Sequence, residues 1–191
     1  MKLGTKRGQH RFVWDLKHEP PRGAKRQFAI AATYKGTPSG PVGPLVLPGP
    51  YIVRLTVDGT TIEKQLIVKM DPRVKTSKEQ IEKQSLLSKT CYDGYHQLQE
   101  IRDAIDSKSD VSGKVAEFRG PGAPGDPDTM YGSIHQSAIE EETIVSLQHK
   151  FLFMLKLLQA ADANISTQAV AGVEALQTSL EGMKARWEKL K

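Results

Sequence analysis

Residues 51–68 read YIVRLTV-DG-TTIEKQLIV, two runs of alternating apolar and polar residues on either side of Asp58-Gly59. A two-residue Asp-Gly connection predicts a β-hairpin, because both turn positions need a positive φ angle. In the register that this turn sets, four cross-strand pairs share one face: Val57 with Thr60, Leu55 with Ile62, Val53 with Lys64 and Tyr51 with Leu66. This mostly apolar face should point at a core, with Lys64 near a rim or a bulge.

Two further strands are expected before the hairpin. Residues 11–16 (RFVWDL) are rich in β-formers and are followed by the turn sequence PPRG, while residues 28–34 form a weaker candidate. We expect Trp14 to be buried in the core of this β-part. Residues 36–50 contain nine prolines and glycines, which excludes a helix because proline lacks the amide donor and clashes with the preceding turn.

After Pro72 the apolar spacing changes from two residues to about 3.6, which predicts helices. A capping-box pattern at 77–80 (SKEQ) should start the first helix. Its packing seam steps by three and four residues: Leu87, Cys91, Gly94, Leu98, Ile101 and Ile105. Gly94 should let a neighbouring helix approach closely, at a helix-propensity cost of about 1 kcal/mol relative to alanine.

Two more helices are expected. A second capping-box pattern at 137–140 (SAIE) should open a helix that is apolar on much of its circumference, and therefore the most buried one, through Ile144, Leu147, Phe151, Met154, Leu155 and Leu158. Residues 163–166 form a turn. The last helix carries the seam Val173, Leu176, Leu180, Met183, Trp187 and Leu190. Three helices joined in this way predict an antiparallel bundle. The fold class is therefore α+β in two parts, β-structure over 1–71 and helices over 75–191 with a Gly/Pro-rich loop at about 107–136.

The net charge of +5 is unevenly distributed. Residues 1–26 carry eight basic and two acidic side chains, so the rest of the chain sums to about −1. Such asymmetry suggests nucleic-acid binding through a basic N-terminal arm, but no recognition motif accompanies it, and a solvated strand and loop is the preferred interpretation. The sequence contains neither a signal-peptide pattern nor a long apolar run, so we expect no membrane span. Localisation stays open between a cytoplasmic protein, a mature exported domain and a fragment.

Each residue with potential chemistry has a structural explanation. The five histidines, His10, His18, His96, His135 and His149, lack the i, i+4 spacing of metal ligands, and a surface role is expected for those on helices. Glu140, Glu141 and Glu142 suit the first turn of a helix, where negative charge complements the dipole. Cys91 lies on an apolar seam and is expected to be a buried hydrophobe, and the Asn164-Ile165-Ser166 acceptor pattern occurs often by chance. The sequence therefore assigns no catalytic, cofactor-binding or metal-ligating residue.

Several phrases resemble the C-terminal region of large bacterial proteins of the sortilin-like, Asp-box-repeat β-propeller class that are described as glycosyl hydrolases. These phrases are residues 11–16 (RFVWDL), 43–51 (GPLVLPGPY), 66–74 (LIVKMDPRV) and 146–163 (SLQHKFLFMLKLLQAADA). The β-part is also similar to the immunoglobulin-like repeat of flagellar hook-assembly proteins. The resemblance implies an Ig-like β-sandwich over 1–71 followed by a helical tail, in proteins that are exported.

The chain departs from these relatives in ways that decide its expected function. It contains no propeller and no Ser-x-Asp-x-Gly-x-x-Trp pattern, and an Ig-type sandwich needs about seven strands where 1–71 offers four. We therefore expect a non-catalytic accessory or protein-interaction module with an unfinished sandwich. Its expected partner is a protein, either a propeller domain or a second copy at the open sandwich edge. The alternative is a subunit or fragment of a sugar-acting hydrolase that needs a separate propeller, and no cofactor is expected.

Overall fold

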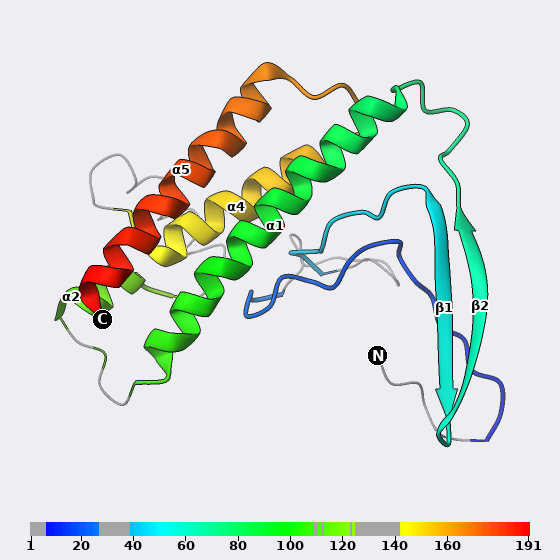
Figure 1. The fold of residues 1–191 in the computed structure, drawn as a ribbon, viewed down its shortest axis with the longest axis horizontal. Coiled ribbons are helices and arrows are strands. Elements are labelled where there is room, and N and C mark those ends of the chain that lie inside the picture. Colours follow the sequence, from blue (N-terminus) through cyan, green and yellow to red (C-terminus); the bar gives the residue numbers. More distant parts are fainter. Residues whose placement is uncertain (1–6, 27–38, 109–110, 112, 123, 125–141) are drawn as a thin grey trace.

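The computed structural model describes residues 7–26, 39–108, 111, 113–122, 124 and 142–191. In this part the chain is a mixed α+β protein with a two-stranded antiparallel sheet and four helices. The elements are β1 (Gly49–Val57), β2 (Thr60–Val68), α1 (Lys78–Asp106), α2 (Gly113–Arg119), α4 (Ile144–Leu158) and α5 (Thr167–Leu190). Figure 1 shows the hairpin as an arm beside the helical part.

Helices α1, α4 and α5 share one hydrophobic core, and α4 runs against the direction of both neighbours (Figure 1). The core combines the seams of the three helices: Cys91, Tyr95, Leu98 and Ile105 from α1, Ile144, Leu147, Phe151, Leu152, Leu155 and Leu158 from α4, and Val173, Leu176, Leu180, Met183 and Trp187 from α5. The prediction that the 144–158 helix is the most buried is confirmed, since ten of its fifteen residues are buried. Packing of these seams, more than helix propensity, holds the helices together.

The observed start of α1 agrees with the prediction from the sequence, whereas the observed start of α4 does not. Ser77 caps α1 and accepts a hydrogen bond from the amide of Gln80, as the capping-box pattern predicts. Helix α4 instead begins at Ile144, where the side chains of Thr143 and Ser146 form a reciprocal capping box. The expected start at 137 lies outside the described residues, but one continuous helix from there through 158 is wrong because Glu142 and Thr143 are not helical.

The hairpin has the predicted turn and register. Asp58 and Gly59 have φ angles of 48° and 79°, and Tyr51 pairs with Leu66, Val53 with Lys64 and Leu55 with Ile62. The prediction that its apolar face points at a core is wrong in the described part of the chain, because these strands remain exposed along most of their length. Two strands cannot bury an apolar face without a further layer.

The segment before the hairpin differs from the prediction. Residues 11–16 are not a strand; next to them a single bridge joins Lys17 to Leu45. Leu16 has a φ angle of 59°, a left-handed conformation that costs a leucine roughly 1–2 kcal/mol and turns the chain away from a continuing ladder. The candidate strand 28–34 lies outside the described residues, so the four expected strands are two here.

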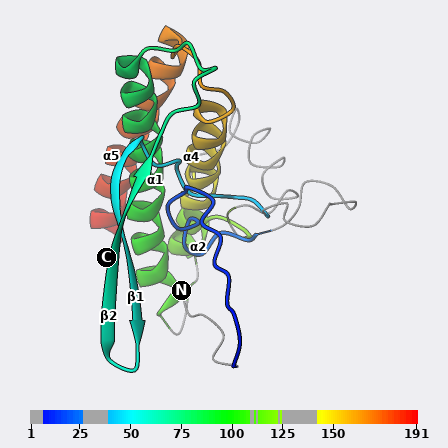
Figure 2. The same ribbon diagram turned by 90° about the vertical axis from the view of Figure 1, so that its right-hand side faces the viewer.

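Segment 7–17 runs along one side of the hairpin (Figures 1 and 2). Trp14 packs edge-on against Tyr51 with ring centroids 5.4 Å apart, and its indole N–H donates to the carbonyl of Lys17 at 3.0 Å. Trp14 is half-buried, so the expectation of a fully buried core tryptophan is wrong. The reason is that the two-stranded sheet beside it has no second sheet to enclose the ring among the described residues.

Candidate interaction surface

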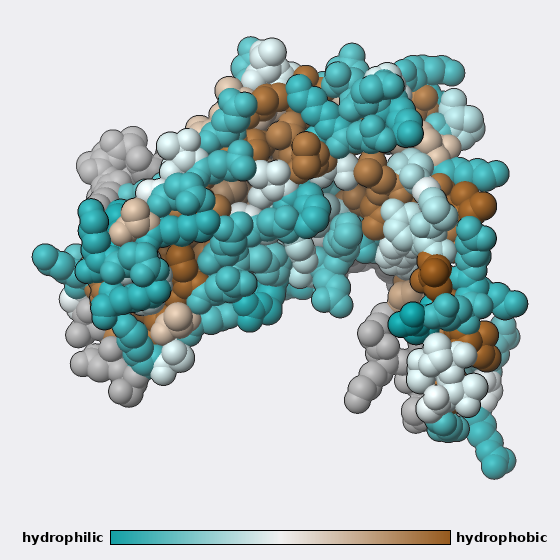
Figure 3. Space-filling view, viewed as in Figure 1, coloured by the Kyte–Doolittle hydropathy of each residue, from teal (hydrophilic) through white to brown (hydrophobic). Residues whose placement is uncertain are grey.

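The apolar face of the hairpin is only partly covered in the described structure. Its aliphatic side chains are between 38% and 55% exposed: Val53, Leu55, Val57, Ile62 and Leu66. They alternate along two paired strands, so their side chains form one continuous surface. Figure 3 shows the hairpin end projecting away from the helical part. Contiguous exposed apolar surface of this kind marks interaction sites in soluble proteins.

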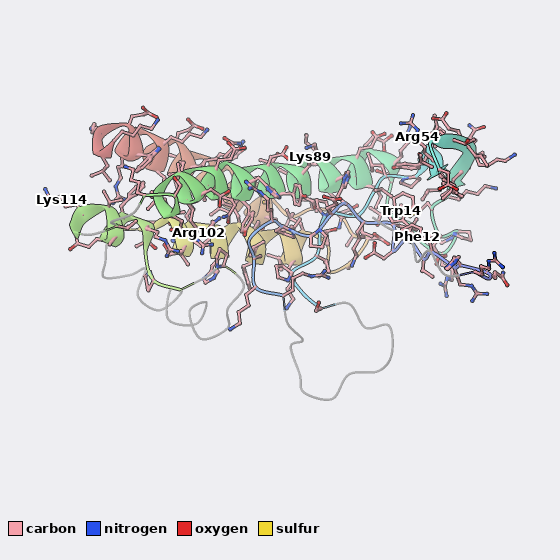
Figure 4. All side chains as sticks on the ribbon, turned by 90° about the horizontal axis from the view of Figure 1, so that it is seen from below. Phe12, Trp14, Arg54, Lys89, Arg102 and Lys114 are labelled. Atoms are coloured by element: carbon pink, nitrogen blue, oxygen red, sulfur yellow. The ribbon has the colours of Figure 1, made fainter. Side chains whose placement is uncertain are left out.

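The N-terminal segment extends this surface. Phe12 and Val13 are 49% and 76% exposed, and Figure 4 shows Phe12 beside Trp14 below the hairpin. The same segment carries Arg7, Arg11 and Lys17, whose positive charges flank the apolar residues. We call Val53, Leu55, Val57, Ile62, Leu66, Phe12 and Val13 the arm surface. It combines aliphatic area with basic charge at its border.

The two faces of the hairpin differ in how their charges are satisfied. On the face opposite the arm surface, Arg54 and Glu63 form an ion pair at 2.7 Å. Lys64 stands on the apolar face, opposite Val53, and no hydrogen bond or ion pair joins its Nζ to a described residue. Lys64 also lines a shallow hollow of about 440 Å³ together with Tyr51 and Gln65.

Hydrogen bonds hold together the root of the arm and tie it to the end of α4. The amides of Val46 and His18 donate to the carbonyls of Leu16 and Pro44 at 2.9 and 2.8 Å, which joins the two chain segments at the root. The amide of Leu45 then donates to Oε1 of Gln159, just beyond α4, at 2.6 Å. The root is therefore anchored while the strands beyond it are exposed.

A polar seat on α1 holds the strap formed by residues 18–26. The hydroxyl of Tyr95 donates to the carbonyl of Arg22 at 2.9 Å, and the guanidinium of Arg22 pairs with Asp103 at 2.7 Å. Burial raises the pKa of Tyr95, which keeps the hydroxyl protonated as a donor. Gln99 continues the network by donating to Asp103 at 2.7 Å and accepting from Gln148 at 3.1 Å.

His96 lies at the edge of this seat. Its ring centroid is 4.5 Å from that of Tyr92 and 5.4 Å from that of Tyr95. Its Nε2 is buried and makes no hydrogen bond to a described residue. Burial, and then the nearby charge of Arg22, lower the pKa of His96, so the ring favours the neutral form. The ring is half-buried, not on the polar face expected from the sequence.

A second hollow lies at the other end of the helices, beside α2. It has a volume of about 1,100 Å³ and is lined by charged residues around Phe118, including Asp106, Lys114, Glu117, Arg119, Arg186 and Lys189. Arg119 holds Asp106 in a two-pronged ion pair at 2.6 and 3.1 Å and lowers the pKa of that carboxyl. Phe118 stacks on Trp187 at 6.1 Å, with Lys108 over the Trp187 ring. In this hollow, Asp106 and Arg119 are thus already paired with each other.

The remaining sequence candidates have structural roles. Cys91 is buried as predicted, and burial raises its pKa to about 12, which makes the thiol unreactive. His149 is 1% exposed, so the expected surface role is wrong; all six residues from 144 to 149 are buried between helices. Glu142 precedes α4 instead of standing in its first turn, and pairs with Lys150 at 2.7 Å.

His10 and His18 are exposed, while His135, Glu140 and Glu141 lie outside the described residues. Ser166 of the Asn164-Ile165-Ser166 pattern caps α5. Within the described ranges no group of three histidine, cysteine or acidic residues could hold a metal ion. No described helix is long and apolar enough to cross a membrane.

Sequence reasoning missed the polar members of the α1 seam. The buried positions include Gln84, Ser88, Gln99 and Arg102, and the amide of Gln84 donates to the carbonyls of Leu158 and Ala161. A signal was present, because 81, 84, 88, 91, 95, 98, 102 and 105 step by three and four residues throughout. A packing seam that is predicted from apolar residues alone omits these buried polar positions.

Comparisons of the chain with protein-family models, curated proteins and solved structures gave no match.

Proposed function

We propose that the chain is a non-catalytic interaction module. In this proposal residues 1–71 form an unfinished Ig-like sandwich, and α1, α4 and α5 form an antiparallel three-helix bundle that serves as its base within 75–191. The observation that carries the proposal is the contrast between the two parts. The apolar seams of the helices are buried, whereas the aliphatic residues on one face of the hairpin are 38–55% exposed.

The arm surface resembles the inner face of one sheet of a β-sandwich. Two sheets pack face to face when aliphatic residues alternate along paired strands and the second sheet covers them. Segment 7–17 lies along the hairpin with an edge-on contact between Trp14 and Tyr51, and the aliphatic residues of this face remain 38–55% exposed. A partner that brings its own β-sheet would bury these residues and complete the layer.

The partner that we propose is a protein of the propeller class suggested by the sequence phrases, with this chain corresponding to the C-terminal part of such proteins. Under this proposal any sugar hydrolysis resides in the propeller. The general acid of a glycosidase is a carboxyl group whose pKa is raised. The carboxyls of the described residues with a resolved change, Asp71, Glu79 and Asp106, all have lowered pKa values. This supports the accessory role over the alternative of a catalytic subunit.

Hydrogen exchange of the intact chain tests the proposal. An unfinished sandwich should exchange its β1 and β2 amides quickly, while the amides of α1, α4 and α5 exchange slowly because they open only with the core. Helix α5 provides the internal reference. Equal protection of the hairpin and the helices would mean that the β-part is complete without a partner, and the proposal would fail.

A further inference from the structure

We infer that the outer edge of β2 is the docking edge of the arm, and that it accepts an extended segment of a partner protein with an acidic side chain opposite Lys64 between aliphatic residues. This inference rests on the proposed function. It adds which edge is used, how the incoming strand is aligned and which chemistry the partner presents.

The hairpin register decides which backbone groups are available. In a two-residue hairpin the residues that border the turn, Val57 and Thr60, form a hydrogen-bonded pair, and such pairs alternate along the strands. With the observed register, the outward amide and carbonyl groups of β2 therefore belong to Thr61, Glu63, Gln65 and Ile67. All four positions have an amide proton, so this edge offers a full set of donors and acceptors to a new strand.

The edge of β1 is less suited to strand addition. Its outward positions are Pro50, Ile52, Arg54 and Thr56 by the same alternation, and proline has no amide to donate. Figure 1 also places β2 on the side of the arm farther from the helices, with β1 between β2 and the helical part. An incoming segment thus finds more donors at β2 than at β1.

Lys64 specifies the side chain that should lie opposite it. On an antiparallel strand added to β2, the position opposite Lys64 belongs to a pair without backbone hydrogen bonds, where facing side chains are closest. The neighbour of Lys64 on β1 is Val53, and no described residue supplies a counter-charge to the ammonium group. A carboxylate on the new strand supplies one, and aliphatic residues two positions away continue the apolar rows of Ile62 and Leu66.

A second copy of the chain fits this edge less well. Two-fold pairing of β2 with itself at full overlap centres on Lys64 and places two ammonium groups opposite each other, which is unfavourable. The basic N-terminal segment adds further like charge near the arm. Charge complementarity therefore favours an acidic strand from another protein.

The test uses the intact chain labelled with ¹⁵N and the capped peptide Thr-Val-Thr-Glu-Thr-Val-Thr, titrated to millimolar concentration. Saturable amide shifts and slowed exchange are expected at Thr61, Glu63, Gln65 and Ile67, and not at Ile52, Arg54 and Thr56. A peptide with lysine in place of glutamate should bind about threefold more weakly. Lys64→Glu should reverse this preference, whereas Lys83→Glu, a change at an exposed position of α1, should leave it unchanged.

Three results would overturn the inference: no saturable shift on β2, shifts on the β1 edge instead, or binding that is insensitive to the charge at position 64. Sedimentation that shows a dimer with protected β2 amides in the absence of peptide would assign the edge to a second copy and also overturn it. These failures leave the proposed function standing as long as the hairpin of the free chain exchanges quickly. Slow exchange in the free chain is the separate result that defeats the proposed function.

Discussion

The ring of Phe151 lies so close to Gly94 that a β-carbon on residue 94 would stand 2.7 Å from Cε1 and Cζ of the ring. The absence of a side chain at Gly94 of α1 lets the ring of Phe151 of α4 enter between the helices. Phe151 is fully buried, so its ring has no free space into which to retreat. The close helix approach that the sequence predicted at Gly94 is confirmed at this contact.

Gly94→Ala should therefore destabilise the chain although alanine is the better helix former. Overpacking of a filled core costs roughly 1–3 kcal/mol, against a gain in helix propensity of about 1 kcal/mol. Gly182→Ala is the matched control, because a β-carbon there meets nothing within 4 Å, and it should stabilise by about 1 kcal/mol. Urea unfolding, monitored by the helical circular dichroism signal, measures the stability of both variants. A Gly94→Ala protein as stable as the Gly182→Ala protein would show that the Phe151 ring moves freely.

Tyr95→Phe should loosen the strap of residues 18–26. The substitution leaves the carbonyl of Arg22 without its donor, at a cost of about 1–2 kcal/mol. Tyr92→Phe removes a similar bond, from Tyr92 to the carbonyl of Glu19 at 3.1 Å, but this bond is exposed to solvent, so the effect should stay within about 0.5 kcal/mol. Hydrogen exchange at residues 19–26 should rise in the first variant only. Equal effects of the two changes would show that the buried seat does not hold the strap.

The stability of the chain should fall as the pH decreases below 6.5, in part through His96. The folded state lowers the pKa of this ring, so the unfolded chain binds a proton more readily; the contribution of His96 is complete above pH 6.5 and is lost as pH falls toward the folded pKa. Asp93 and Glu100 oppose the shift, while burial and Arg22 produce it. His96→Gln should flatten the pH dependence of unfolding between pH 7.5 and 5, whereas His18→Gln, at an exposed position, should not. An unchanged slope in His96→Gln would contradict this assignment.

The purified chain should not hydrolyse aryl glycosides or polysaccharides. In the 1,100 Å³ hollow beside α2, Arg119 keeps Asp106 ionised, and an ionised carboxylate cannot protonate a leaving group. Release of nitrophenol, with a known glycosidase as positive control, measures the activity. Turnover that disappears in Asp106→Asn or Glu117→Gln would establish an active site in this chain.

The elements that the sequence predicted best are those specified by local chemistry. Asp58-Gly59 fixes the hairpin turn and hence the register of nine residue pairs, and the 3–4 stepping of apolar residues identifies the cores of α1, α4 and α5. These signals depend on backbone conformation or periodicity within one segment, so a single sequence contains them.

The sequence-based predictions fail where burial or strand pairing depends on residues that are distant in the sequence. Trp14 has the composition of a core residue, but its burial depends on a second layer that the described chain does not supply. The sequence predicts a surface role for His149, but α1 and α5 enclose the first turns of α4 and bury this residue. Residues 11–16 have the β-propensity of a strand, yet they form no ladder, and next to the left-handed Leu16 a single bridge joins Lys17 to Leu45. The candidate docking edge could be predicted only in part, because register follows from the turn while exposure follows from tertiary packing.

The uncovered hairpin also has a thermodynamic consequence. The heat-capacity increase on unfolding comes mainly from apolar surface that becomes hydrated, and Val53, Leu55, Val57 and Ile62 are already about half hydrated in the folded chain. Melting of the isolated chain should thus report almost entirely on the helices, with a heat-capacity change per residue below the usual ~12–15 cal/mol/K. Burial of the arm by a partner would appear in calorimetry as a negative heat-capacity change of binding.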